Sequence, residues 1–571
     1  MKKGKYILFI LLFFLFLVTV TVIAFIYSEF RRPPEVEADS FLEIDLAGPF
    51  PELSAPDFLT GYLLGGRTLS VHDVWKSFRK AKVDDRIRCV LLRLGYLECD
   101  WAKISEVRDA VRGFRESGKK VYAYIEEAPE FDKEYYLATA CDRIILHPLG
   151  WLGVNGIGGW VPFFKEGLDK LGVEAHFEHV EEYKTAYNMF MEKGFTQAHK
   201  LMMEAIYQDI FAEYVRAVAE ARKKTEDEVK AIIDKGLYQG EQALQAGLVD
   251  SLLYEDELGT ILQDRGKKLK QTRFSEYVRT SPAGLGLETG RKVALIYATG
   301  PIFGGEGIST RMIGGRTLSR AIRRAREDRS VAAIVLRVDS PGGSAVASDV
   351  IWRETFLAKK EKPLVISMSD LAGSGGYWIS MAGHRIVAQP QTLTGSIGVL
   401  AGKFSLAGLY EKLGITGERM TYGQKADLFS TFRPFSPEER KLLKEQILWT
   451  YDKFLTKAAE GRNLTREDVD KVGRGRVWTG RQAREIKLVD ELGGLDKALD
   501  LAKSLAGIPA EEDVRLVVWP QRTSFFSTIF GRSQAKTDLF PSSELNKLLQ
   551  TLQVLQRENP WAVMPFWLPT H

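Results

Sequence analysis

The chain has 571 residues, of which 45% are hydrophobic and 27% are charged, ordinary values that exclude a disordered, a collagen-like or a multi-span membrane protein. The formal net charge of +4 leaves no basic surplus of the kind that binds nucleic acid. The three cysteines, Cys89, Cys99 and Cys141, are too few for a disulfide framework and lack metal-ligand spacing. We therefore expect no metal site and at most one disulfide.

The first notable segment is an uncharged run of 22 residues from Tyr6 to Tyr27. As a helix rising about 1.5 Å per residue it would reach about 33 Å, enough to cross a hydrocarbon core of about 30 Å. Three lysines precede it, which favours a cytoplasmic N-terminus. A cleaved signal peptide is the alternative, but the run is longer than such peptides need and has no Ala-x-Ala cleavage site. The pattern predicts a single-pass membrane anchor.

The rest of the chain contains an internal repeat. The hexapeptide GGRTLS occurs at 65–70 and again at 314–319. Further matches follow in the same order at slowly shrinking offsets, including CVLLRL with AIVLRV and a Leu-Val-Asp near the end of each copy. Such colinearity indicates two copies of one unit. The expected organisation is a cytoplasmic N-terminus (1–5), an anchor (6–27), an N-terminal domain (40–272), a linker (273–291), a C-terminal domain (292–515) and a tail (516–571).

Within the second copy, short apolar runs alternate with helical patterns. Strands are expected at 293–297, 332–338, 364–368 and 386–388, and helices at 318–326, 345–357 and 437–460, the last matched by 196–223 in the first copy. Fully apolar strands that alternate with helices are typical of a parallel sheet covered on both faces. Each copy is therefore predicted to be an α/β unit.

Two glycine-rich turns follow these strands. In Asp339-Ser-Pro-Gly-Gly-Ser344, the adjacent Gly342 and Gly343 could turn backbone amides toward a bound group, as an oxyanion hole requires. In Leu371-Ala-Gly-Ser-Gly-Gly-Tyr-Trp378, Ser374 opens a helical stretch. This serine is either an ordinary helix N-cap or a nucleophile at a helix N-terminus.

Comparison of the two copies separates these readings. The positions that correspond to the glycine pair in the first copy are Glu98 and Cys99, and those that correspond to Ser374 and Gly375 are Asp132 and Lys133. If these residues served only the fold, both copies would need them. Their joint presence in one copy favours a single active site, formed mainly by the second copy.

A serine nucleophile needs a general base. His384 is the only histidine in the second copy and lies ten residues after Ser374, which disfavours a Ser-His-Asp triad. A lysine can act as the base where burial lowers its pKa toward neutrality. Lys184 lies in a run of this kind, Glu182 to Phe190, but a single lysine is far more often a solvated surface charge, so the pattern alone does not assign the base.

Together, the anchor, the repeat and the SPGG and SGGYW motifs resemble the signal peptide peptidase A (protease IV) family in its long, tandem form. The resemblance extends from the anchor to about residue 500. It implies two tandem Clp-protease/crotonase-like α/β domains and a Ser/Lys dyad whose serine lies in the second copy and whose lysine lies in the first. The nucleophile then matches Ser374, and the family's Tyr-Lys-small pattern matches Tyr183-Lys184-Thr185.

The resemblance also assigns supporting residues. The segment Thr394 to Gly398 reads Thr-Gly-Ser-Ile-Gly, in which Ser396 would orient the lysine. Gly342 or Gly343, with the amide of Gly375, would supply the oxyanion hole. Shorter relatives carry their lysine about fifty residues after the serine, and here Lys425 stands in that place. Lys184 is favoured because its local sequence matches the long form, with Lys425 as the alternative base.

The implied activity is serine endopeptidase action on cleaved signal peptides, through an acyl-enzyme and without a cofactor. The implied location is a bacterial inner membrane, with the catalytic part outside the cytoplasm, and the implied assembly is a homotetramer. A sibling protease that cuts membrane-protein segments, a crotonase-type CoA enzyme and a non-catalytic membrane scaffold are the alternatives. The leucine stripe at 545–555 and the aromatic end at 560–568 indicate a tail that packs on another subunit or domain, or lies at a lipid interface.

Overall fold

The structure is a computed structural model that describes residues 34–54, 69–128, 131–264, 266–307 and 312–519, the backbone of 561–563, and positions 13–15, 17, 18 and 21. The anchor expected at 6–27 thus lies mostly outside the described residues, which include six of its positions, and so does most of the tail. Within the described ranges, no helix combines the length and the apolar character needed to cross a membrane.

The first copy is built on a six-stranded parallel sheet in the order β11-β1-β2-β3-β4-β8. Its strands are β1 (Ser40–Pro49), β2 (Ile87–Glu98), β3 (Lys120–Ile125), β4 (Arg143–Leu146), β8 (Ser251–Leu252) and β11 (Lys270–Arg273). The helices of this copy are α3 (Val71–Val83), α4 (Trp101–Arg115), α5 (Asp132–Ala138), α6 (Lys165–Leu171), α7 (Asn188–Met191), α8 (Gln197–Arg222), α9 (Glu226–Lys235), α10 (Gly240–Gln245) and α11 (Phe274–Tyr277). Smaller pieces are the pairs β5 (Trp151–Val154) with β7 (Gly236–Gln239) and β9 (Gln263–Asp264) with β10 (Lys267–Lys268), and the 3-10 turns η1 (Glu255–Thr260) and η2 (Ala283–Leu285).

The second copy has a sheet in the order β21-β19-β17-β15-β12-β23, in which β18 also pairs with β17, and β22 pairs with β18. Its strands are β12 (Lys292–Thr299), β15 (Val331–Ser340), β17 (Leu364–Gly373), β18 (Arg385–Ala388), β19 (Leu393–Gly395), β21 (Val477–Thr479), β22 (Glu491–Leu492) and β23 (Arg515–Trp519). Its helices are α12 (Gly315–Glu327), α13 (Ala345–Glu361), α14 (Gly375–Ser380), α15 (Ala407–Lys412), α16 (Pro437–Arg462), α17 (Arg466–Val472), α18 (Gly480–Glu485) and α19 (Leu495–Leu505). The four strands expected in this copy are confirmed, and all pair in parallel.

The two copies repeat individual contacts. The hydroxyl of Tyr135 donates to the carbonyl of Leu248, and Tyr377 makes the same bond to Leu488. Both long helices start at a hydroxyl cap, Thr196 for α8 and Ser436 for α16, whose side chains accept a backbone N–H of the first turn. The mixed α/β fold and its repetition are thus visible in side-chain contacts as well as in strand order.

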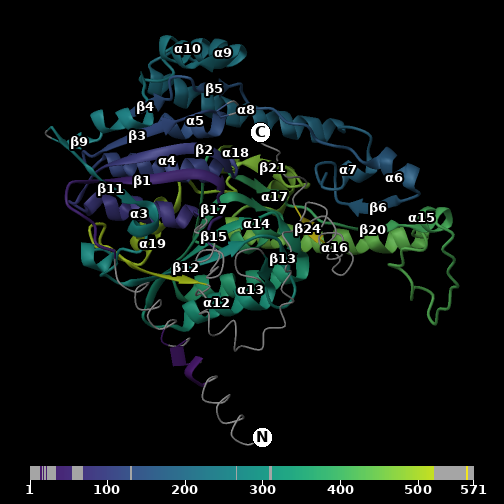
Figure 1. Cartoon of the computed structure of the whole chain (residues 1–571). Helices are drawn as coiled ribbons and strands as arrows, with labels where there is room; N and C mark the ends of the chain where they lie inside the picture. Colours follow the sequence, from purple (N-terminus) through teal and green to yellow (C-terminus); the bar gives the residue numbers. More distant parts are fainter. Residues whose placement is uncertain are drawn as a thin grey trace, which may run out of the picture.

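The two sheets are stacked with helices α3, α4 and α19 between them (Figure 1). Alternate residues of β12 show this arrangement: Val293 and Leu295 belong to the core that these helices share, whereas Ala294 and Ile296 face a second core under α12, α13, α14 and α16. A strand buried on both faces carries no polar alternation, which is why the buried part of β12, Val293 to Ala298, has no alternating polar residues. Helix α4 of the first copy thereby lies close to the sheet of the second.

A third sheet joins the copies and was not anticipated. It runs β14-β13-β16-β24-β20-β6, with β13 (Ile302–Phe303), β14 (Ile313–Gly314), β16 (Gly342–Ser344), β20 (Leu400–Ser405), β6 (Glu174–His179) and β24 (Trp561–Val563). Strand β6 belongs to the first copy and pairs antiparallel with β20 of the second. This pairing brings the loop after β6, which contains Lys184, to the second copy.

Candidate active site

Ser374 lies between β17 and α14 in a constrained backbone conformation. Its φ of 54° and ψ of −111° are unusual for a residue with a side chain, and such strain is found where function requires it. The turn is held by two bonds: the amide of Ser374 donates to the carbonyl of Gly395 at 2.8 Å, and the amide of Trp378 donates to the carbonyl of Ser374 at 2.8 Å. The side chain is fully buried, so its hydroxyl has a fixed environment.

Lys184 reaches this serine from the other copy. After β6, the amide of Val180 donates to the carbonyl of Val399 at 3.0 Å, which continues the pairing with the second copy. The Nζ atom of Lys184 then lies 2.8 Å from the Oγ of Ser374. It also lies 2.9 Å from the Oγ of Ser396 and 3.0 Å from the carbonyl oxygen of the same residue. The structure therefore brings together the three residues singled out from the sequence.

The surroundings of Lys184 favour its neutral form. The side chain is 1% exposed, and this burial lowers the pKa of its amine well below the usual lysine range, because desolvation disfavours the charged form. The three oxygen atoms within hydrogen-bond distance of Nζ belong to hydroxyls and a backbone carbonyl. A neutral amine can donate its two hydrogens to Ser396 and direct its lone pair at the Ser374 hydroxyl, which is the arrangement of a general base.

Two glycines shape the space around the lysine. A Cβ atom on Gly475 would lie 2.5 Å from the Cα and the backbone nitrogen of Lys184, and one on Gly398 would lie 3.1 Å from its Cδ. Gly475 also has a φ of +82°, and its amide donates to the carbonyl of Ile397 at 2.8 Å. Any larger residue at 475 would push the lysine backbone away from Ser374.

The glycines expected to form an oxyanion hole lie beside the nucleophile. A Cβ on Gly375 would lie 3.0 Å from the backbone nitrogen of Gly343 and 3.1 Å from the Cα of Gly342. A Cβ on Gly343 would clash with the carbonyl of Ile302 at 2.1 Å, and Gly342 has a φ of 99°. Gly375 can thus approach residues 342–343 this closely only because it has no side chain, and Gly343 can lie against Ile302 for the same reason.

The backbone of the tail segment 561–563 lies next to this turn. Strand β24 pairs antiparallel with β16, with Gly342 opposite Val563 and Gly343 opposite Ala562, and it pairs antiparallel with β20 through Leu400. An extended chain therefore fills the slot between the glycine turn and the strand that follows Ser396.

The alternative residues lie elsewhere. Lys425 is exposed, in the turn-rich stretch before α16, and its backbone carbonyl accepts the amide of Leu428. The ring Nδ1 of His384 accepts the amide of Leu364 at 3.1 Å, so this histidine serves the end of a strand. The three cysteines are free thiols. In the part of the chain that the structure describes, no group of three or more His, Cys, Asp or Glu could hold a metal ion.

The sequence profile of Peptidase family S49 matches residues 113–270 and 357–509, one segment in each copy and together more than half of the chain. The chain belongs to peptidase family S49. Similar proteins include the chloroplastic serine protease SPPA of Arabidopsis thaliana, 36% identical over 79% of this chain and 68% of that protein. Protease 4 of Haemophilus influenzae is 32% identical over 77% of this chain and 73% of its own, and Protease 4 of Salmonella typhi is 33% identical over 87% and 83%.

These relatives and the family identify this S49 chain as a serine endopeptidase. Its expected resemblance to signal peptide peptidase A is confirmed, and the readings as a CoA enzyme or a non-catalytic scaffold are set aside. Among solved structures, a mutant of ClpP1 from Listeria monocytogenes aligns with 36% of this chain and 94% of its own, at 13% identity and a TM-score of 0.24.

Sequence reasoning missed some residues around the site of this S49 peptidase. Gly475 left no signal, because its contact with Lys184 joins two distant loops. Gly398 stood in the recognised Thr-Gly-Ser-Ile-Gly segment, where its place beside a serine could have drawn attention. Lys103 and Asp339 form a buried ion pair between the copies, 2.8 Å from Nζ to Oδ2. Lys103 lies in a helix with many charged residues, a pattern typical of a surface helix, so the sequence alone predicts an exposed lysine.

Proposed function

We propose that the protein cleaves peptides with a Ser374/Lys184 dyad. The observation that carries this proposal is the 2.8 Å separation of Lys184 Nζ from Ser374 Oγ in a buried site, where desolvation lowers the pKa of the amine well below its usual range. A neutral lysine is a base of sufficient strength to remove a serine proton during attack, whereas a protonated one has no lone pair to offer.

In the acylation step, Lys184 takes the proton of the Ser374 hydroxyl as Oγ bonds to the peptide carbonyl carbon. The tetrahedral intermediate collapses when the carbon–nitrogen bond breaks and the lysine returns the proton to the leaving amine. Water then attacks the acyl-enzyme and gives a proton to Lys184. The bond between Oγ and the acyl carbon breaks, Lys184 returns the proton to Oγ, and the new carboxyl end is released. Ser396 keeps Nζ aimed at the nucleophile through both steps, because its hydroxyl and carbonyl accept the two amine hydrogens.

The negative oxygen of the intermediate needs donors that are in place before the reaction. The amides of Gly375 and of Gly342 or Gly343 are proposed for this role, since these glycines meet beside the nucleophile. A single such donor is worth on the order of 100-fold to 1,000-fold in kcat in serine proteases.

The substrate is proposed to bind as an extended strand between β16 and β20. Both strands have edges directed at this slot, and the backbone of residues 561–563 pairs with both of them. Main-chain hydrogen bonds in such a slot recognise any extended peptide, so side-chain selectivity arises only from neighbouring pockets.

The proposed substrates are the remnants of signal peptides, and the proposed location is the bacterial inner membrane. The uncharged run 6–27 would anchor the chain with residues 1–5 in the cytoplasm and the catalytic part on the outer side. An anchored peptidase would meet apolar peptides where they remain in the bilayer. A sibling protease that cuts segments of membrane proteins would use the same chemistry, and only substrate preference separates the two.

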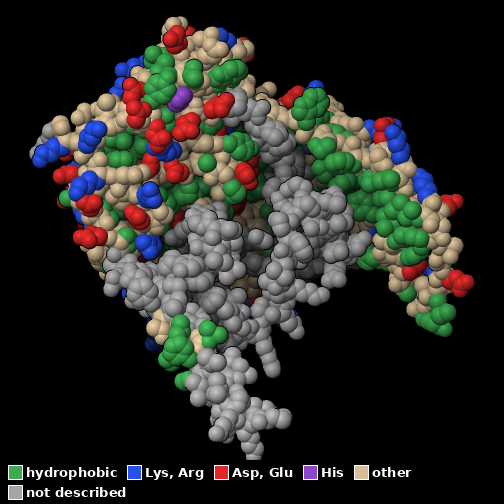
Figure 2. Space-filling model, viewed as in Figure 1, with side chains coloured by type: hydrophobic (Ala, Val, Ile, Leu, Met, Phe, Trp, Pro, Cys, Tyr) green, Lys and Arg blue, Asp and Glu red, His purple; other side chains and the backbone are tan. Residues whose placement is uncertain are grey.

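A homo-oligomer, proposed to be a tetramer, is supported by one surface. Hydrophobic side chains gather over an arm that projects from the body and consists of β6, β20, α6, α7 and α15 (Figure 2). Exposed members on or beside this arm include Phe164, Leu171, Leu413 and Ile415. A patch of this kind on a protein surface is typical of contact with another subunit.

The test uses the full chain in detergent micelles with two synthetic peptides of equal length, a signal peptide and a polar, charged peptide. We expect the signal peptide to be cleaved internally by the wild type and not by Ser374→Ala. Equal cleavage of both peptides would overturn the substrate class, and cleavage by Ser374→Ala would overturn the dyad.

A further inference from the structure

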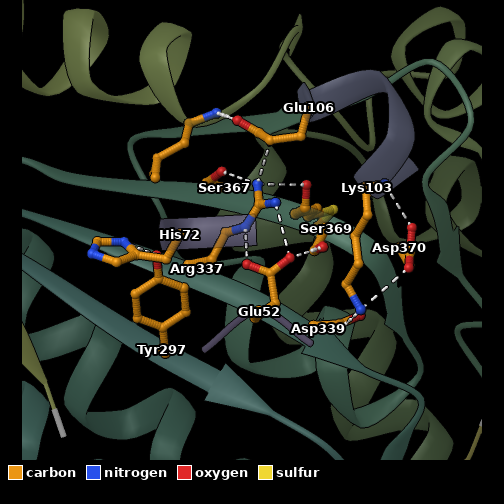
Figure 3. Close-up of polar contacts among 12 residues, drawn as sticks. Glu52, His72, Lys103, Glu106, Tyr297, Arg337, Asp339, Ser367, Ser369 and Asp370 are labelled. Atoms are coloured by element: carbon orange, nitrogen blue, oxygen red, sulfur yellow. Dashed lines mark hydrogen bonds and ion pairs between the residues drawn. The ribbon is translucent and has the colours of Figure 1, made fainter. Parts of the chain in front are cut away.

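A cluster of buried charges lies between the two copies (Figure 3). Arg337 of β15 is 1% exposed and is held by two carboxylates of the first copy, Glu52 at 2.9 Å and Glu106 at 3.0 Å. Beside this group, Lys103 of α4 binds two carboxylates of the second copy, Asp339 at 2.8 Å and Asp370 at 3.3 Å.

The two aspartates lie shortly before the proposed catalytic groups in the chain. Asp339 lies at the end of β15, three residues before Gly342 of the proposed oxyanion turn. Asp370 lies in the last part of β17, four residues before Ser374. The strands are connected here by a bond from the amide of Leu371 to the Oδ1 of Asp339 at 3.2 Å. Both carboxylates thus lie at the irregularity of the β15–β17 ladder, between the pairs Val338–Met368 and Ser340–Ala372, directly before the strand ends that carry the catalytic groups.

Helix α4 holds Asp370 by its backbone as well. The amides of Asp100 and Lys103, in the first turn of α4, donate to the carboxylate of Asp370 at 3.1 and 2.8 Å. A carboxylate at a helix N-terminus is favoured by the free N–H groups and by the helix dipole. The ammonium group of Lys103 completes the arrangement, since it lies between Asp370 and Asp339 (Figure 3).

The surroundings of Lys103 favour its charged form. Burial by itself lowers the pKa of the amine, but the attraction of Asp339, Asp370 and Glu52 together outweighs burial and raises the pKa well above the usual value. Without this charge, two carboxylates would face each other in a site shielded from water, where like charges repel strongly.

We infer that Lys103 is a positioning residue for the active site: by binding Asp339 and Asp370 together, it fixes the oxyanion turn relative to Ser374. This inference rests on the proposed function. The first copy would then supply both the base, Lys184, and the lysine that positions the oxyanion turn, Lys103; we call the contact of Lys103 with Asp339 and Asp370 the clamp. Lys103 does not touch the reacting atoms, so it acts through the position of Gly342 and Gly343.

Loss of this clamp should affect the transition state more than substrate binding. A misplacement of about 1 Å can reduce catalysis about 100-fold. We expect Lys103→Met to lower kcat about 100-fold with KM changed less than about threefold, since the oxyanion exists only after attack. A peptide boronate, whose adduct with the serine resembles the tetrahedral intermediate, should lose affinity by the same factor as kcat/KM.

The matched control is Lys80→Met. Lys80 is another buried lysine of the first copy, and its Nζ donates to the carbonyl of Tyr277 at 2.7 Å and to the hydroxyl of Thr280 at 2.9 Å, remote from the active-site turns. This variant should be less stable but retain wild-type kcat. Lys103→Arg keeps the charge but changes the geometry of the contact with Asp339 and Asp370, so it is expected to fold and to lower kcat about threefold to tenfold. If Lys103→Met does not fold, the kcat and the boronate affinity of Lys103→Arg test the inference in its place.

The inference is overturned if Lys103→Met, or failing that Lys103→Arg, has both the kcat and the boronate affinity of the wild type. It is also overturned if Lys80→Met lowers both by the same factor as Lys103→Met, since the loss would then be one of general stability. A wild-type protein that neither cleaves peptide nor binds the boronate at Ser374 would instead contradict the proposed function itself.

Discussion

The amine of Lys184 lies 2.8 Å from the hydroxyl of Ser374, although the two residues are 190 positions apart and belong to different copies of an internal repeat. The contact exists because β6 of the first copy pairs with β20 of the second. Neither copy contains a complete dyad, so the catalytic unit of this S49 peptidase, as we propose it, is the whole tandem.

Replacing the proposed base should abolish activity. Lys184→Ala removes the amine that lies beside Ser374, and loss of a nucleophile's general base in serine peptidases lowers kcat by several orders of magnitude. We expect at least about a 1,000-fold loss in kcat/KM for a cleaved peptide. Lys425→Ala is the matched control and should behave as the wild type, because Lys425 is exposed. An active Lys184→Ala enzyme would rule out the assignment.

The pH dependence of activity should show the lowered pKa of Lys184. Only the neutral amine can accept the serine proton, so kcat/KM should rise with pH through the lysine pKa and become constant below the usual lysine range near about 10.4. A profile that still rises above about pH 10 in the wild type would contradict a neutral Lys184.

Ser396→Ala removes one hydrogen-bond acceptor of the Lys184 amine and should lower kcat about tenfold to 100-fold without abolishing it.

The buried amine of Lys184 should lower the free energy of unfolding at neutral pH. In the unfolded chain Lys184 binds a proton up to about pH 10.4, whereas the folded protein releases it at lower pH, so between these two pKa values folding expels a proton. Each pKa unit of this difference is worth about 1.4 kcal/mol. Lys184→Met should therefore raise Tm at neutral pH, by an amount that shrinks as the pH approaches about 10.4. An unchanged or lowered Tm would indicate that the amine is charged in the folded state.

Much of the architecture could be predicted from local patterns. The apolar strands β12, β15 and β17 are buried on both faces and are readable as continuous hydrophobic runs. The repeat placed Ser374 and the glycine pair in one copy only, which pointed to a single site. These inferences depend on residues close in sequence or on matches between copies. The structure confirms the strands, and the single active site stays a prediction.

The contacts between copies could not be read in this way. Pairing of β6 with β20 leaves no periodic signal, because a half-exposed strand accepts many partners. Helix α4 is covered on both sides by sheets, so its charged residues Lys103, Glu106 and Arg108 are buried although their pattern is that of a surface helix. Only the tertiary arrangement supplies the opposite charges that make such burial tolerable.

Gly475 should be intolerant of a side chain. Gly475→Ala would place a Cβ 2.5 Å from the backbone of Lys184, so we expect the base to shift and kcat to fall about 100-fold. The control is Gly507→Ala, at a position with a similar positive φ of +60° and open space around it. Both variants carry the same type of backbone strain, and only the first should lose activity. Equal losses would assign the effect to strain.

Removal of residues 540–571 should increase the affinity for peptide substrates. The backbone of 561–563 fills the slot between β16 and β20 that the substrate is proposed to use, so the tail competes with it. We expect KM to fall severalfold in the truncated protein, with kcat unchanged. The control is a full-length chain with 545–555 replaced by a Gly/Ser linker, which leaves 561–563 in place. A higher KM after truncation would mean that the tail assists binding.

The identity of the nucleophile is the most direct test of the whole account. The full-length protein in detergent is treated with a serine-directed fluorophosphonate, digested, and analysed by mass spectrometry, in parallel with Lys184→Ala and Lys425→Ala. The account predicts one stoichiometric adduct on Ser374 in the wild type and in Lys425→Ala, and its loss in Lys184→Ala. An adduct on another serine, or undiminished labelling of Ser374 without Lys184, would contradict it.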